Sequence, residues 1–153
     1  MKKVHGMGAR ERLLLQIAVQ LHDCGKYISM ADVAECSYRI IMATEIIGLS
    51  TEERQVIASA VRYNTTEFVY YENFDDGAGM DRNRYLLVAK LTAILRLANA
   101  MDRSHYQKVE GLRAVLKDRE LHLIIDSSRD IFSGAGTFKR QGGIFLKKYL
   151  AFI

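Results

Sequence analysis

The sequence contains no proline and only two cysteines, Cys24 and Cys36, among its 153 residues. Because proline is absent, helices must be stopped by glycine and by turn-forming side chains. Two cysteines are too few for a disulfide framework or a four-cysteine zinc site, and they favour a reduced setting. No apolar run approaches the roughly 18 residues of a transmembrane helix, and no signal-peptide core follows the charged start. We therefore expect a cytoplasmic protein without membrane contact.

Charge is unevenly distributed along the chain. The composition, 49% hydrophobic and 26% charged, is that of a globular protein, and the length suits one domain with a small appendage. Residues 1–105 carry 13 basic and 13 acidic side chains, whereas residues 106–153 carry 9 basic and 5 acidic ones. The whole net charge of +4 therefore arises in the last third. This excess predicts a polyanionic partner, with an ordinary solvated surface as the alternative.

Hydrophobic periodicity predicts helices over the first two thirds of the chain. The first apolar helical face consists of Leu13, Leu14, Ile17, Ala18 and Leu21. We expect Gly25 to end this segment in the left-handed conformation, and Gly48 to close a second helix over residues 31–47. Ser50 and Glu53 then form a capping-box pattern, which predicts the start of a third helix.

Residues 65–81 lose the helical period and predict an exposed loop. Tyr70, Tyr71 and Phe74 lie in this loop, and they either anchor it to the core or stack on a base. Helical spacing resumes near Asn83 and continues to Met101, which predicts a long fourth helix.

After residue 107 the apolar period changes from that of a helix to that of a strand. The alternating apolar positions are Leu112, Ala114 and Leu116, and then Leu121, Leu123 and Ile125. With a turn over residues 117–120, this pattern predicts a β-hairpin, and a helix interrupted at Gly142 and Gly143 follows it. The predicted fold is therefore mainly α, with a helical bundle over 1–107 and a small α/β subdomain over 108–153.

The string Leu21-His22-Asp23-Cys24-Gly25-Lys26 carries the most chemical information. Imidazole and carboxylate are good ligands for divalent metals, but a metal needs at least two further ligands from other helices. The alternative is a histidine at a helix end whose ring bonds to a backbone carbonyl.

This string resembles the signature of HD-domain proteins, an all-helical fold of metal-dependent phosphohydrolases. Four further strings match, in order, the C-terminal region of the exopolyphosphatase and guanosine pentaphosphate phosphatase (Ppx/GppA) family. They are Gly8–Leu15, Ser37–Ile41, Ala60–Tyr63 and Leu95–Ser104. The hairpin and last helix are similar to the small α/β module that ends those proteins. The resemblance covers nearly the whole chain and implies an HD-like helical bundle with a small extension.

The resemblance also implies where catalysis occurs. In this family, two N-terminal lobes of actin-like ATPase fold carry the phosphatase chemistry, and this sequence contains no phosphate-binding glycine loop. We therefore expect the C-terminal portion of a longer enzyme, without hydrolytic activity on its own, with a genuinely short protein as the alternative.

The HD-type metal site is expected to be degenerate. The resemblance implies His22 and Asp23 as its remaining metal ligands, and Asp102 could substitute for the missing late aspartate with a different geometry. Cys36 and Asn64 stand where family members have histidine, and Asn99 stands where HD proteins have the late aspartate. We expect no resident cofactor, with a divalent metal at His22 and Asp23 as the alternative; a Cys36 thiolate near His22 could also ligate zinc.

Basic residues in the matching strings and the tail predict a phosphate-binding surface. The candidates are Lys26, Arg62, Arg96, Arg103, Lys139 and Arg140. In an HD-like fold several of them should converge near His22, where guanidinium groups suit phosphate oxygens. The alternative is that each arginine pairs with an acidic side chain.

Three hypotheses follow for the function. The first is a non-catalytic C-terminal domain of a Ppx/GppA-type phosphohydrolase that supports polyphosphate binding, dimerisation or regulation. The second is an autonomous metal-dependent HD phosphohydrolase acting on a nucleotide or phosphate ester, and the third is an interaction module without a small ligand. Expected partners are polyphosphate or another phosphate-rich anion, the N-terminal catalytic lobes and a second copy, but no specific nucleic acid.

Overall fold

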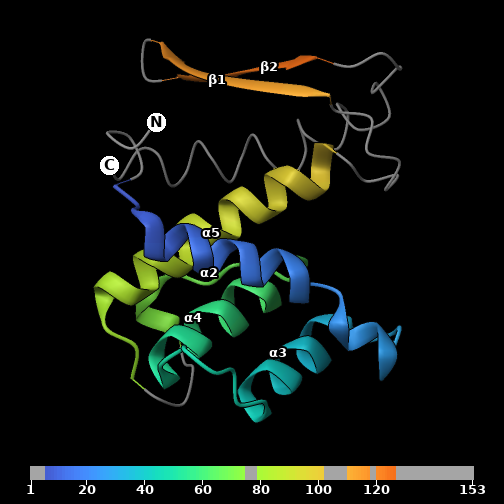
Figure 1. Cartoon of the computed structure of the whole chain (residues 1–153). Helices are drawn as coiled ribbons and strands as arrows, with labels where there is room; N and C mark the ends of the chain where they lie inside the picture. The colour runs from blue at the N-terminus through green and yellow to red at the C-terminus, as the bar shows by residue number, and fades with distance from the viewer. Residues whose placement is uncertain (1–5, 75–78, 102–109, 118–119, 127–153) are drawn as a thin grey trace. The chain divides into compact units, whose positions relative to one another are not determined.

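The computed structural model describes residues 6–74, 79–101, 110–117 and 120–126. The helices are α2 (Ala9–Leu21), α3 (Val33–Ala43), α4 (Thr51–Arg62) and α5 (Arg82–Met101), with short 3-10 turns η1 (Cys24–Tyr27) and η2 (Tyr71–Asn73). Two strands follow, β1 (Gly111–Lys117) and β2 (Glu120–Asp126) (Figure 1). This mainly helical architecture with a small extension confirms the predicted fold class. No helix in these ranges is long and apolar enough to cross a membrane.

Backbone contacts divide the chain into a unit of residues 6–95 and a second unit formed by the remainder, and each is described by itself. The predicted domain boundary at residue 107 stays a prediction. The last predicted helix, residues 138–153, lies outside the described residues.

Helix α4 is the central helix of the 6–95 unit, and it contacts both α2 and α3 (Figure 1). It begins with the predicted capping box: the Glu53 backbone N–H donates to Ser50 Oγ, and the Ser50 N–H donates to Glu53 Oε2. Every residue from Gln55 to Val61 is buried, as expected for a helix surrounded by neighbours.

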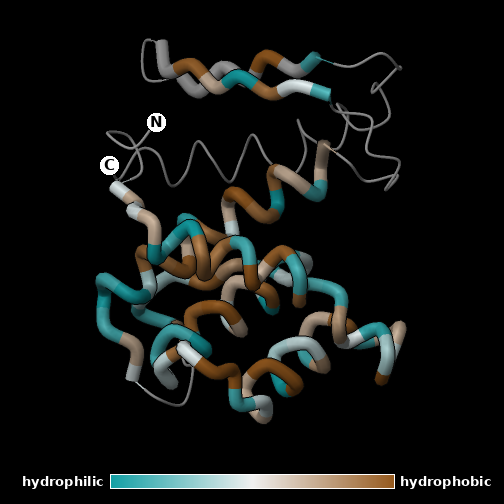
Figure 2. Tube along the Cα trace, viewed as in Figure 1, coloured by the Kyte–Doolittle hydropathy of each residue, from teal (hydrophilic) through white to brown (hydrophobic). Residues whose placement is uncertain are grey.

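The core of the unit joins α2, α3, α4 and the first two thirds of α5. Its buried members include Leu14 and Ala18 of α2, Val56, Ile57 and Val61 of α4, and Val88 and Leu91 of α5. Hydrophobic segments of these helices lie in the interior of the unit (Figure 2). Burying each valine, leucine or isoleucine side chain contributes about 1.5–3 kcal/mol, so this layer contributes strongly to the stability of the unit.

The connection between α2 and α3 contradicts the prediction for Gly25. This glycine is buried within η1 and does not have a positive φ. A Cβ atom built on it would lie 2.2 Å from the Val33 carbonyl oxygen and 2.6 Å from the Ser37 backbone nitrogen. Its N–H donates to Ser37 Oγ at 2.8 Å. Glycine is needed here because η1 touches the first turns of α3, and not because the backbone is left-handed.

Helix α3 also ends earlier than predicted, at Ala43 instead of near residue 47. Thr44 turns to an extended conformation, and its hydroxyl bonds to the Ile40 carbonyl. Ile47, which the helical pattern had placed on an apolar face, is 99% exposed. Gly48 has a φ of +87°, but the prediction that it closes this helix is wrong, because the chain already leaves the helical conformation at Thr44.

The loop before α5 is anchored by aromatic rings. Phe74 lies edge-on to Tyr85, with ring centroids 5.1 Å apart, and Tyr71 approaches Tyr85 at 5.3 Å. Phe68 contacts both Tyr63 and Tyr85. The described part of the loop is therefore attached to the core, which agrees with the interpretation that these aromatic residues anchor the loop.

The hairpin prediction is confirmed. Strands β1 and β2 pair antiparallel, with Gly111 opposite Asp126, Ala114 opposite Leu123 and Lys117 opposite Glu120. This register places the two predicted apolar runs opposite each other.

Candidate functional site

The candidate site begins where α2 ends. His22 follows directly after the last helical residue, and its Nδ1 lies 2.8 Å from the Val19 carbonyl oxygen. A carbonyl can only accept, so Nδ1 carries the hydrogen and Nε2 of the neutral ring keeps a lone pair. Nε2 lies 3.6 Å from Asp23 Oδ2. The bond to a backbone carbonyl is the arrangement expected of a histidine at a helix end, and it also leaves the other nitrogen free to act as a ligand.

Asp23 forms an ion pair with Lys26, which the sequence analysis predicts to bind phosphate. The Lys26 ammonium contacts Asp23 Oδ2, one 3-10 turn away. This is the same carboxylate oxygen that faces His22. An ammonium group at this oxygen competes directly with any divalent cation, because both need the same lone pairs.

The remaining predicted metal ligands do not complete a site within the described ranges. No group of three His, Cys, Asp or Glu side chains comes together there. Cys36 and Cys24 are free and half-buried, and Asn64 is buried at the end of α4. Asp102 lies outside the described residues. The described donors, His22 and Asp23 alone, do not fit a tightly held metal.

Of the predicted phosphate-binding residues, the structure describes Lys26, Arg62 and Arg96. Lys26 contacts Asp23, whereas Arg62 reaches a different acid, with its Nη2 3.0 Å from Glu35 Oε2. Arg96 lies in the other unit, where it is half-buried. Arg103, Lys139 and Arg140 lie outside the described residues.

Three residues around Arg62 were missed by the sequence analysis: Glu35, Tyr38 and Arg39. Arg39 Nε donates to Glu35 Oε1 at 3.0 Å, and the Arg62 guanidinium lies over the Tyr38 ring, 5.1 Å from its centroid. The i,i+4 spacing of Glu35 and Arg39 could have indicated their pairing. The approach of Arg62 could not be seen, because 27 positions separate it from Glu35 and only the packing of α3 on α4 joins them.

A bidentate ion pair links Arg10 of α2 to the start of α4 and to the connection between α3 and α4. Two nitrogens of the Arg10 guanidinium, Nε and Nη2, each donate to Glu53 at 2.6 Å, and Nη2 also donates to the Gly48 carbonyl. The Arg10 bonds, followed by the Ser50 backbone N–H, lower the pKa of Glu53 to about 2. Because every partner is internal, this is a structural clamp and no ligand site.

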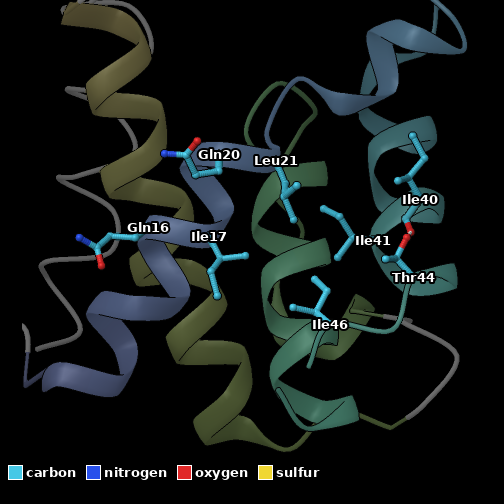
Figure 3. Close-up of a pocket in the computed structure, with 8 residues that line it drawn as sticks. All are labelled: Gln16, Ile17, Gln20, Leu21, Ile40, Ile41, Thr44 and Ile46. Carbon is cyan, nitrogen blue, oxygen red and sulfur yellow. Dashed lines mark hydrogen bonds between the residues drawn. The ribbon is translucent and has the colours of Figure 1, made fainter. Parts of the chain in front are cut away.

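An open groove of about 380 Å³ separates α2 from α3 (Figure 3). It is lined by Gln16, Ile17, Gln20, Leu21, Ile40, Ile41, Thr44 and Ile46. Ile17 and Leu21 point toward the side of Ile41, while the two glutamine amides point away from it (Figure 3). The lining carries no charged side chain, so the groove does not suit a phosphate group.

Comparison with known protein families matches residues 2–133 to Ppx/GppA phosphatase, domain III. No curated protein matches the chain. The family match covers the helical unit and the hairpin, and it includes the His22-Asp23 pair, Lys26, Arg39 and Arg62. The chain therefore belongs to the Ppx/GppA phosphatase family, through its domain III.

Proposed function

We propose that this chain serves a Ppx/GppA-type phosphohydrolase as a binding and supporting domain for a phosphate-rich ligand such as polyphosphate, and that it does not hydrolyse the ligand by itself. Domain III is the part of the family that the chain matches. In this proposal, the hydrolytic chemistry belongs to N-terminal catalytic lobes that act as partners, in the cytoplasm.

The observation that carries the proposal is the contact between Lys26 and Asp23. In an HD-type site the His-Asp pair would face a metal, but here the Asp23 oxygen nearest His22 already meets an ammonium group. The motif is therefore internally neutralised. Its backbone is also fixed, because Gly25 packs on α3 without room for a side chain.

Charge supports the phosphate-rich ligand. Residues 106–153 hold the whole basic excess of the chain, including Lys139 and Arg140. Polyphosphate repeats its charge along the chain as a nucleic-acid backbone does, so counterion release would favour binding and make it sensitive to salt. A second copy of the chain, assembled as a homodimer, would double the number of basic contacts available to one long polyanion.

Two measurements test this function. Phosphate release from polyphosphate and from guanosine pentaphosphate should stay at background for the isolated chain. Binding of fluorescein-labelled polyphosphate, followed by anisotropy, should occur at 50 mM salt and weaken by about tenfold or more at 200 mM, the direction that counterion release requires. Binding that is absent at low salt, or unchanged by salt, would contradict the proposal.

A metal-dependent HD phosphohydrolase is the second candidate, and the geometry of His22 favours it. The Nδ1 bond to the Val19 carbonyl is the outer contact that metal-ligating histidines commonly make. This function needs at least one ligand from beyond the described residues, and Asp102 is the sequence candidate. Elemental analysis of protein purified without chelator decides between the two. A near-stoichiometric transition metal that His22→Ala removes would establish this second function and overturn the first.

A further inference from the structure

Three side chains on α3 and the last residue of α4 form a second charged group, which we call the Glu35 cluster: Glu35, Tyr38, Arg39 and Arg62. The Glu35 carboxylate is shared between two arginines, one on each oxygen. Arg39 Nε donates to Oε1 at 3.0 Å, and Arg62 Nη2 lies 3.0 Å from Oε2. A single negative charge thus faces two positive charges, and the cluster keeps a net positive charge.

Both guanidinium groups keep donors for a further anion. Each arginine offers five N–H groups, and the bonds to Glu35 use one nitrogen of each. The Arg39 side chain is 77% exposed and that of Arg62 is 37% exposed, so the remaining donors are accessible from solvent. The ring of Tyr38 holds the Arg62 guanidinium by a cation–π contact, which limits the orientations that Arg62 can adopt.

The chemistry of these donors selects the ligand class. A guanidinium binds carboxylate and phosphate in the same forked geometry, and a terminal phosphate presents three oxygens and more negative charge than one carboxylate. The Arg39–Glu35 pair is an exposed i,i+4 ion pair, and pairs of this kind hold weakly. A phosphate group can therefore take the place of Glu35 between the two arginines.

We propose that Arg39 and Arg62 bind a terminal phosphate group, and that Glu35 is the internal anion which this group displaces. The inference rests on the proposed function, since it names the place where the phosphate-rich ligand binds. The Glu35 cluster is separate from the His22-Asp23 pair in sequence and uses arginines on α3 and α4 instead of Lys26.

The most informative substitution removes the negative charge of Glu35 and leaves the two arginines in place. Glu35→Gln should tighten the binding of fluorescein-labelled polyphosphate by about fivefold, the size expected for loss of one competing exposed ion pair. Arg62→Ala should weaken the binding by about tenfold, because a charge-assisted bond is lost. Arg39→Ala should weaken it by less, because the Arg39 side chain is the more exposed of the two. If Arg62→Ala does not fold, Arg62→Lys keeps the charge without the fork and should give an intermediate loss.

Asp81→Asn provides the matched control. Asp81 also pairs with an arginine, Arg84, at 2.6 Å on the first turn of a helix. The substitution adds the same net charge as Glu35→Gln, and asparagine preserves the capping bonds to the Asn83 and Arg84 backbone. The dissociation constant of the Asp81→Asn variant for polyphosphate should stay within about twofold of the wild-type value, as expected for an exposed surface pair. Equal tightening by both substitutions would show a general charge effect and overturn the proposed site.

The remaining outcomes separate this inference from the proposed function. Wild-type binding that none of the Glu35, Arg39 and Arg62 substitutions alters would keep the function and overturn the site. Binding that appears only in Glu35→Gln would support the site and contradict the function. Competition by inorganic tripolyphosphate and by GTP then distinguishes a bare phosphate chain from a nucleotide as the source of the terminal phosphate.

Discussion

The connections before and after α3 both contain a glycine, but the glycine is required for a different physical reason in each. The α2–α3 connection is closed by direct contact, because the Gly25 backbone lies against Val33 and Ser37. The α3–α4 connection is open and is held by polar groups: Gly48 is left-handed, and nothing lies within 4 Å of a Cβ built on it. The comparison teaches that glycine after a helix has two distinct physical causes, and that only one of them is conformational.

The two connections also differ in what their charged groups do. In the first, Lys26 meets Asp23 within the family motif, between exposed side chains. In the second, Arg10 reaches from α2 to Glu53 and to the Gly48 carbonyl, so the ion pair joins three parts of the unit. The α2–α3 connection therefore depends on packing, and the α3–α4 connection depends on charged and polar contacts. Substitutions can test this difference.

The largest expected effect is that of Gly25→Ala, which tests the packed connection. The new Cβ would overlap the Val33 carbonyl at 2.2 Å, and the backbone cannot yield as a flexible side chain would. We expect a loss of about 3 kcal/mol or more in the free energy of unfolding, measured by urea denaturation. A loss below about 1 kcal/mol would show that η1 and α3 can separate, and the distinction between the two connections would fail.

Ser37→Ala should be the next largest effect. It removes the hydroxyl that accepts the Gly25 N–H and leaves that buried donor without its partner. The expected loss is about 2 kcal/mol in the same denaturation experiment. Ser29→Ala is the control in the same connection, because its hydroxyl makes only two long bonds of 3.3 Å, and it should cost about 0.5 kcal/mol or less.

Gly48→Ala tests the open connection and should cost about 1 kcal/mol, solely because alanine disfavours a φ of +87°. Gly48→Asn should cost less, since asparagine tolerates the left-handed region. A larger loss in the free energy of unfolding for alanine than for asparagine would indicate that Gly48 is required for its backbone conformation. If both substitutions cost the same, or if Gly48→Ala costs as much as Gly25→Ala, steric contact would have to operate at both connections.

Glu53→Gln should give the smallest effect, about 0.5 kcal/mol at pH 7. Glutamine keeps the capping box, so the change isolates the charge that Arg10 meets. Folding lowers the pKa of Glu53 from 4.5 to about 2, so its stabilisation is complete above pH 4.5 and is lost as the pH falls toward 2. The difference between wild type and variant should shrink over this range. A double variant with Arg10→Met should lose no more than Arg10→Met alone, which also removes the bond to the Gly48 carbonyl; additive losses would mean that Arg10 and Glu53 do not interact.

The sequence predicted the elements whose causes are local. The capping box at Ser50 and Glu53, the long helix ending at Met101 and the hairpin all follow from spacings of a few residues. It did not predict the role of Gly25, because the atoms that exclude a side chain come from α3, eight to twelve positions later. The early end of α3 was hidden by the apolar Ile46 and Ile47, which continue a helical pattern that the backbone abandons at Thr44.

The candidate site was predictable to the same extent. The family motif and the family itself could be read from the order of short strings, and the family match agrees with them. The partners of the basic side chains could not be read. Lys26 meets an acid three positions before it, whereas Arg62 meets one 27 positions away through helix packing. Sequence spacing can predict a contact between residues that are close along the chain, but it cannot predict a contact that depends on helix packing.

The reach of Arg10 has a consequence for the rate at which the unit opens. Its partners lie 38 and 43 positions away, so these bonds can form only after the intervening helices have been brought together. Contacts of this range that are absent from the folding transition state slow unfolding and leave the folding rate almost unchanged. We expect the clamp to act as a kinetic latch: its removal should shorten the lifetime of the folded unit more than it delays refolding.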